Sequence, residues 1–167
     1  MPLSSASRRK WPLLRGGGLG FALRVKRSRR HGIPGLPARD KSALSHELGE
    51  RAGMALKSDP SAIVGALLAR ERLGSTGIGE GIAIPHARVS GTDQPFAMFA
   101  RIEPPIDFEA IDRKLVDLVF LLITPDTGAA VHLSLLAAIS RALRKSVTAS
   151  ALREAPTARE MFEVLKL

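Results

Sequence analysis

The sequence predicts an α+β fold: a three-layer α/β/α sandwich in which helices flank both faces of a small mixed β-sheet. Two segments with helical periodicity come first, short apolar runs of strand length follow, and three further helical segments close the chain. The apolar run at 116–123 is almost continuous, which is typical of a central strand covered on both faces. At 167 residues the chain has the size of one ordinary domain.

The first two helices are predicted over 41–56 and 60–72, where apolar residues recur at helical spacing. Asp59 is a suitable N-cap for the second helix and Pro60 a suitable first residue, because proline lacks the N–H that this position leaves unpaired. Gly74 stands just past the end of that helix, where glycine tolerates the backbone conformation that terminates helices.

The middle of the chain contains the expected strands. A glycine-rich loop over 74–81 leads into a short strand at 81–84, which Pro85 is expected to stop. A second strand is predicted at 96–102, followed by a turn at Pro104 and Pro105, and the third is the run at 116–123. Helices are then predicted over 129–144, near 148–153 and over 157–165.

The net charge of +9 is carried entirely by the beginning of the chain. Residues 1–40 hold ten of the 25 Lys and Arg residues but one of the 16 acidic residues, so the remainder is neutral. We therefore predict a basic, flexible N-terminal extension over 1–37, with 21–26 as a possible strand, and a folded domain over 38–167. The extension could bind nucleic acid or anionic lipid. The pair of arginines at 8–9 lacks the apolar stretch of an export signal.

The composition excludes several classes of protein. The chain has no cysteine, which excludes disulfides, thiolate metal sites and cysteine nucleophiles. It has no apolar run long enough to span a membrane, so no membrane insertion is expected. One Trp, six Phe and no Tyr are too few aromatic residues for a base-stacking surface, so no nucleic-acid partner is expected for the domain.

Residues 70–86 combine the groups that an anion site needs. Glycines allow close approach of the backbone, Ser75 and Thr76 offer hydroxyl donors, and the planar guanidinium of Arg70 matches phosphate geometry. His86 beside them could act as a nucleophile. The segment lacks the lysine of a Walker loop, and its glycines follow a helix rather than a strand. Spacing alone leaves open a structural glycine-rich turn beside a structural histidine.

The run at 67–87, L-L-x-R-E-R-L-G-S-T-G-I-G-x-G-I-A-I-P-H-A, resembles the phosphorylation-site signature of fructose/mannitol-type IIA domains of the bacterial phosphotransferase system. It looks most like the nitrogen-related regulatory branch. The similarity continues at 105–108, 116–120 and 131–133, and it covers roughly residues 40–167. Glu80 and Leu115 stand where the family often has Asn and Pro, and neither position is expected to touch the phosphoryl site.

The resemblance implies a role for each matching residue. His86 corresponds to the phosphorylated histidine, His132 to the second active-site histidine, and Arg70 to the arginine that faces the phosphoryl group. Ser75, Thr76 and Gly77 border the phosphate-binding pocket in this correspondence. The implied phosphoryl donor is a phosphohistidine carrier of the HPr type, and no cofactor, nucleotide or metal is required.

The resemblance therefore implies a cytoplasmic phosphotransferase that carries a phosphoryl group and acts in regulation. The alternatives are a sugar-specific IIA protein that passes phosphate to a IIB domain, and a basic-tailed nucleic-acid-binding module. A metal site on His86 and His132 lacks an evident third ligand. Because His132 shares a helical stripe with apolar residues, it could also be a core histidine, whereas His46 is expected on the surface.

Overall fold

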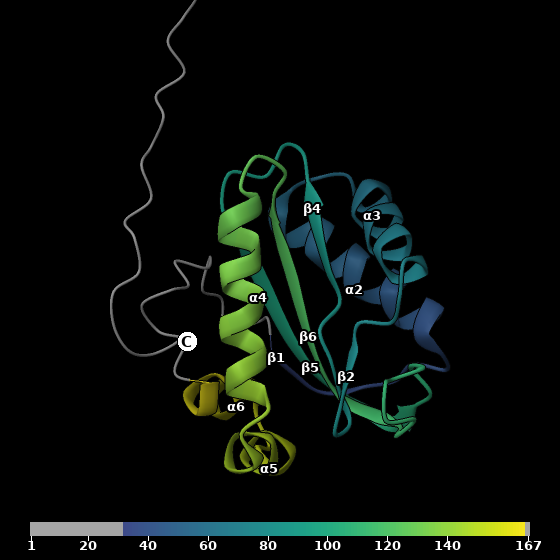
Figure 1. Cartoon of the computed structure of the whole chain (residues 1–167), viewed down its shortest axis with the longest axis vertical. Coiled ribbons are helices and arrows are strands. Elements are labelled where there is room, and N and C mark those ends of the chain that lie inside the picture. The colour runs from purple at the N-terminus through teal and green to yellow at the C-terminus, as the bar shows by residue number, and fades with distance from the viewer. Residues whose placement is uncertain (1–31, 166–167) are drawn as a thin grey trace, which may run out of the picture.

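The computed structural model describes residues 32–165, which form a three-layer α/β/α sandwich as the sequence predicts. In this part of the chain, five helices flank a mixed sheet of six strands. Figure 1 shows the sheet between α4 on one side and α2 and α3 on the other. The predicted extension lies almost wholly outside the described residues, as does the possible strand at 21–26. No helix within 32–165 is long and apolar enough to cross a membrane.

The sheet is built around β6 (Val116–Pro125), whose two edges are both paired. β5 (Phe96–Ile106) runs antiparallel along one edge, and β1 (Gly32–Leu36) pairs in parallel with the outer side of β5. On the other edge, β3 (Ile82–Ala83) and β4 (His86–Val89) both pair in parallel with β6. The short β2 (Gly77–Gly79) pairs antiparallel with β3.

Each face of the sheet carries its own apolar core, because successive side chains of a strand point to opposite faces. Val119, Leu121 and Ile123 of β6 pack beneath α2 (Lys41–Leu56) and α3 (Pro60–Arg72). The alternating set of Leu118, Phe120 and Leu122 packs beneath the other helices, which are α4 (Ala129–Leu143), α5 (Ser146–Glu154) and α6 (Ala158–Leu165). This confirms β6 as the doubly covered central strand.

Local signals set the helix boundaries. The Asp40 carboxylate accepts a hydrogen bond from the Ala43 N–H at 2.7 Å, and the Asp59 carboxylate accepts one from Ser61 at 3.0 Å. Both satisfy a backbone donor that the first helical turn leaves unpaired. The predicted helices at 41–56 and 60–72 are confirmed at the same bounds, and the last three lie within two residues of the predicted ranges.

Two expectations about strands are wrong, and one is incomplete. Residues 32–36 form β1 rather than part of a flexible extension, because pairing with β5 and packing against α6 outweigh their glycine- and proline-rich composition. The strand at 81–84 ends before Pro85 as predicted, in β3, but a further strand that was not predicted, β4, begins directly after the proline at His86 along the same edge of β6. Pro104 and Pro105 lie within β5 where its register with β6 is irregular, so they make no turn.

Candidate active site

His86 lies at the break between β3 and β4. Ile82 pairs with Leu118 before the break, and His86 pairs with Leu122 after it, so both strands follow β6. Pro85 between them has no N–H to donate, although its carbonyl still accepts from the Leu122 N–H at 3.0 Å. The break leaves the Ile84 carbonyl next to the imidazole, at 2.7 Å from His86 Nδ1.

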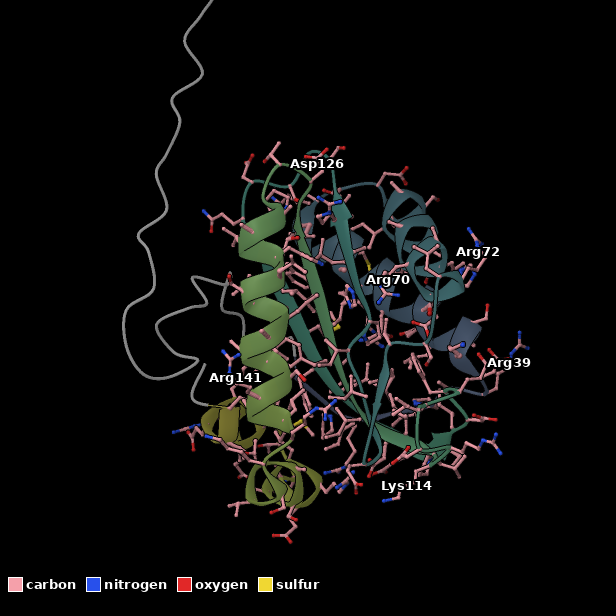
Figure 2. All side chains as sticks on the ribbon, viewed as in Figure 1. Arg39, Arg70, Arg72, Lys114, Asp126 and Arg141 are labelled. Atoms are coloured by element: carbon pink, nitrogen blue, oxygen red, sulfur yellow. The ribbon has the colours of Figure 1, made fainter. Side chains whose placement is uncertain are left out.

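This contact fixes the tautomer of His86. A carbonyl oxygen can only accept, so Nδ1 carries the hydrogen and Nε2 keeps its lone pair. Arg70 faces that lone pair, because its Nε–H donates to Nε2 at 2.9 Å while its Nη1 donates to the Gly74 carbonyl at 3.0 Å. Figure 2 shows Arg70 turned inward between α3 and β4, whereas Arg72 points away from the sheet. His86 thus presents a bare nitrogen beside a guanidinium.

His132 completes the cluster from the first turn of α4. Its ring centroid lies 5.4 Å from that of His86, with the two ring planes tilted by 52°. Its Nδ1 lies 2.7 Å from the Thr124 hydroxyl of β6. Only 8% of His132 and 1% of Thr124 are exposed. The structure therefore brings together the three predicted residues Arg70, His86 and His132, the last of which comes from a helix much later in the sequence.

The two imidazoles are poor bases. Burial is the main cause that lowers the pKa of His86, and the charge of Arg70 adds to it, against the opposing effects of the Ile84 carbonyl and of Glu71. Burial also lowers the pKa of His132 to about 4, with the charges of His86, Arg88 and Arg70 adding to the shift. Both rings are therefore neutral at pH 7.

Ser75 and Thr76 already donate their hydroxyls to groups of the protein. Ser75 Oγ donates to the Phe108 carbonyl at 2.8 Å, and Thr76 Oγ1 donates to the Glu71 carboxylate at 2.6 Å. Glu71 also accepts from the Thr76 N–H at 3.0 Å. These bonds hold the glycine-rich loop against the end of α3. A role of either hydroxyl in binding phosphate stays a prediction, and the contacts do not favour it.

Gly77 has a packing role in the same loop. Its N–H donates to Ser75 Oγ at 3.1 Å, and a Cβ added at Gly77 would lie 2.8 Å from the Cβ of Ala110. Such a separation is too short for two carbon atoms, so only glycine fits here. Its predicted contact with phosphate is likewise a prediction that the structure leaves without support.

Two groups next to the histidines, the Ile84 carbonyl and the Thr124 hydroxyl, were not among the predicted site residues. The I-P-H sequence contained a signal for the first, since a proline inside a strand marks a break in the ladder. Thr124 ends the apolar run of β6, where its alternation with Leu122 places it on the same face. Nothing in the sequence indicated that the first turn of α4 lies over that face.

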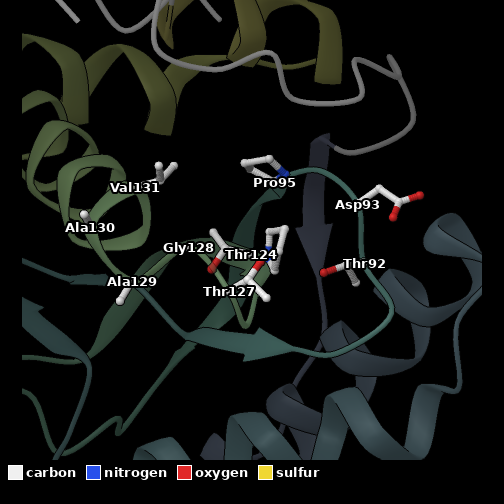
Figure 3. A pocket seen from close by; sticks show the side chains of 10 residues that line it. Thr92, Asp93, Pro95, Thr124, Thr127, Gly128, Ala129, Ala130 and Val131 are labelled. Carbon is white, nitrogen blue, oxygen red and sulfur yellow. The ribbon is translucent and has the colours of Figure 1, made fainter. Parts of the chain in front are cut away.

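The exposed His46 and a pocket at the end of α4 lie apart from the cluster of Arg70, His86 and His132. His46 is on the surface of α2, as predicted. An open pocket of about 410 Å³ lies at the N-terminal end of α4, and neither histidine of the site nor Arg70 lines it. Figure 3 shows Thr124 among its lining residues, together with Thr92 and Asp93 of the loop between β4 and β5. Within residues 32–165, no group of three or more potential metal ligands occurs.

Comparison with known proteins identifies the family. The model of the phosphoenolpyruvate-dependent sugar phosphotransferase system, EIIA 2, matches residues 43–167. The chain belongs to this EIIA 2 family. The expected family is thereby confirmed, and with it a general role in phosphoryl transfer within the phosphotransferase system.

Relatives of the EIIA 2 domain come from both branches of the family. A nitrogen regulatory protein of Bradyrhizobium diazoefficiens is 40% identical over 135 residues, covering 81% of this chain and 88% of the relative. A fructose-specific EIIA component of Haloferax volcanii is 36% identical over 129 residues, covering 77% and 84%. The crystal structure of the nitrogen regulatory protein IIA-Ntr from Neisseria meningitidis has a TM-score of 0.79 at 30% identity, covering 83% of this chain and 94% of that one.

Proposed function

We propose that this EIIA domain accepts a phosphoryl group on Nε2 of His86 from a phosphohistidine carrier of the HPr type. The observation that carries the proposal is the state of His86. Its Nδ1–H is held by the Ile84 carbonyl, and its Nε2 lone pair lies 2.9 Å from the Arg70 guanidinium. A neutral imidazole with a bare nitrogen needs no base to activate it.

The transfer balances without a cofactor. The Nε2 lone pair of His86 attacks the phosphorus of the donor's phosphohistidine, and the bond from phosphorus to the donor's nitrogen breaks. That bonding electron pair returns to the donor imidazole. The new ring, phosphorylated on Nε2, keeps its Nδ1–H on the Ile84 carbonyl and is therefore an imidazolium. The donor ring, whose other nitrogen carries a hydrogen, leaves as a neutral imidazole. Such transfers depend on positioning and charge stabilisation, for which the protein supplies fixed donors.

Arg70 and His132 supply these donors. The Arg70 Nε–H that now donates to Nε2 would turn to an oxygen of the incoming phosphoryl group, while its Nη1 bond to Gly74 holds the side chain in place. The ring centroid of His132 lies 5.4 Å from that of His86, at the positive end of α4. We expect His132→Ala to accept phosphate more slowly and still at His86.

A regulatory role is the form of this function that the comparisons favour, since the relative from Bradyrhizobium diazoefficiens and the structure from Neisseria meningitidis are nitrogen regulatory proteins. The partners of such a protein would respond to its phosphorylation. The second candidate is a sugar-specific IIA that passes phosphate to a IIB domain, which the fructose-specific relative favours. Onward transfer of phosphate from the loaded protein to purified IIB domains separates the two.

The decisive experiment is incubation with phosphorylated carrier protein, followed by intact mass measurement. The parent protein should gain one acid-labile phosphoryl group, and His86→Ala should gain none. His46→Ala is the matched control, because His46 is an exposed histidine on the same domain. Full labelling of His86→Ala would refute the assignment of the nucleophile.

A further inference from the structure

The facing apolar surfaces of β6 and α4 each continue into one polar residue, and these two residues contact each other. Along one face of β6, Leu118, Phe120 and Leu122 belong to the core beneath α4, and Thr124 is the next residue on that face. Along the buried face of α4, the residues are Leu143, Ile139, Leu135 and, in the first turn, His132. At the N-terminal end of α4, the two elements are joined by the 2.7 Å hydrogen bond between Thr124 Oγ1 and His132 Nδ1.

The direction of that hydrogen bond follows from burial. Within residues 32–165, His132 Nδ1 is the only hydrogen-bonding partner of the Thr124 hydroxyl, and 1% of Thr124 is exposed. If Nδ1–H donated to the hydroxyl oxygen, the hydroxyl hydrogen would be buried without an acceptor. If the hydroxyl donates to a bare Nδ1, both groups are satisfied. The second arrangement is the stable one, and it places the ring hydrogen of His132 on Nε2.

The two histidines of the site are therefore held in opposite tautomers. The Ile84 carbonyl, an acceptor, leaves His86 with a bare Nε2. The Thr124 hydroxyl, acting as a donor, leaves His132 with a protonated Nε2. One ring is then a nucleophile and the other a neutral hydrogen-bond donor, without either ring carrying a charge.

Resting on the proposed function, we infer that Thr124 is a positioning residue for phosphoryl transfer: its hydroxyl holds His132 as the Nε2–H tautomer, which donates to the phosphoryl group on His86. With the opposite tautomer, His132 would turn a lone pair toward the phosphoryl oxygens and repel them. Thr124 acts through His132 and does not touch the phosphoryl group itself.

The first test measures the tautomers in the unphosphorylated parent protein. Ring nitrogens labelled with ¹⁵N show by their chemical shifts and couplings which nitrogen carries hydrogen. The inference requires Nε2–H for His132 and Nδ1–H for His86 at pH 7. Finding Nδ1–H on His132 would overturn it. This measurement involves no phosphate, so its result does not depend on whether the parent protein accepts a phosphoryl group. Failure of the parent to accept one would refute the proposed function and leave the tautomer result unchanged.

The second test measures transfer from the phosphorylated carrier in variants of Thr124. Thr124→Val keeps the shape and removes the hydroxyl, so transfer should slow about tenfold, the effect of one hydrogen bond. Thr124→Ser should restore the rate, because it restores the donor. Thr92→Val is the matched control, since Thr92 is also buried and its hydroxyl donates to the Val89 carbonyl at 2.9 Å. It should transfer at the parent rate.

Two results would overturn the role of Thr124. One is a parent-like rate in Thr124→Val. The other is an equal slowing in Thr124→Val and Thr124→Ser, which would indicate that the packing of the methyl group matters and the hydroxyl does not. If Thr124→Val fails to fold, the serine variant and the tautomer measurement still decide the question.

Discussion

Replacing Arg70 with lysine separates the charge of this side chain from its shape. In the unphosphorylated site, the Nε–H of the guanidinium donates to His86 Nε2 at 2.9 Å while Nη1 donates to the Gly74 carbonyl at 3.0 Å. The fixed planar fork makes both contacts at once. A lysine ammonium has one nitrogen, so it can keep a positive charge near His86 but cannot also donate to the Gly74 carbonyl from a second, fixed nitrogen.

The size of the effect follows from the contact that is lost. A hydrogen bond to a charged group contributes about 1.5–3 kcal/mol. If that contact forms with the phosphoryl oxygens in the transition state, its loss slows transfer roughly ten- to a hundredfold. The free energy of unfolding should change little, because the core residues of α3 are untouched.

The assay follows phosphoryl transfer from the phosphorylated carrier by rapid quenching and intact mass measurement, with denaturant unfolding of the same samples. Arg72→Lys is the matched control: Arg72 lies in the same last turn of α3 but points away from the sheet, as Figure 2 shows. It should transfer at the parent rate. Equal rates for Arg70→Lys and the parent, or equal slowing in both variants, would refute the role of Arg70.

Three further predictions concern stability. Gly77→Ala should destabilise the domain by about 1–3 kcal/mol in denaturant unfolding, since its Cβ would collide with Ala110, whereas Gly65→Ala, which meets nothing within 4 Å, should be neutral or stabilising. A destabilised Gly65→Ala beside an unaffected Gly77→Ala would contradict this packing. The pKa of His132 is about 4 in the folded protein against an ordinary value of 6.5, so the unfolded chain takes up a proton on this ring first as the pH falls. The neutral ring therefore opposes folding at no pH above 6.5 and destabilises the folded protein progressively below it. The free energy of unfolding falls by about 3 kcal/mol for this reason as the pH drops to 4. His132→Gln should lose correspondingly less than the parent between pH 7 and pH 4, and identical pH profiles would disprove the perturbed environment. Finally, a truncation that begins at residue 38 should be less stable than one that begins at residue 32, because only the first removes β1. Equal melting temperatures for the two would show that β1 adds nothing.

Features that depend on neighbours in sequence could be predicted. The bounds of α2 and α3 follow from the periodicity of their apolar residues and from the Asp59–Pro60 start, which act within one or two turns. The double burial of β6 follows from its own apolar run. The family follows from the unbroken run at 67–87, which contains both Arg70 and His86.

Features that depend on contacts between residues distant in sequence could not be predicted. Residues 32–36 resemble a linker in composition and become a strand only because β5 offers an edge to pair with. The I-P-H sequence indicated the end of a strand, and β3 ends there, but β4 directly after it forms only because β6 continues and offers an edge to pair with. A strand needs a partner that its own sequence does not contain.

Part of the candidate site could likewise be predicted from the sequence, and part could not. The sequence by itself determined that Arg70 and His86 lie close together, because one short loop separates the helix end from the strand. It named His132 but left it either in the core or in the site. Only the tertiary structure decided where the ring lies, since packing of α4 on β6 buries it and also sets it 5.4 Å from His86. The contact between His132 and Thr124 was likewise beyond the sequence, because only the packing of α4 on β6 brings these two residues together.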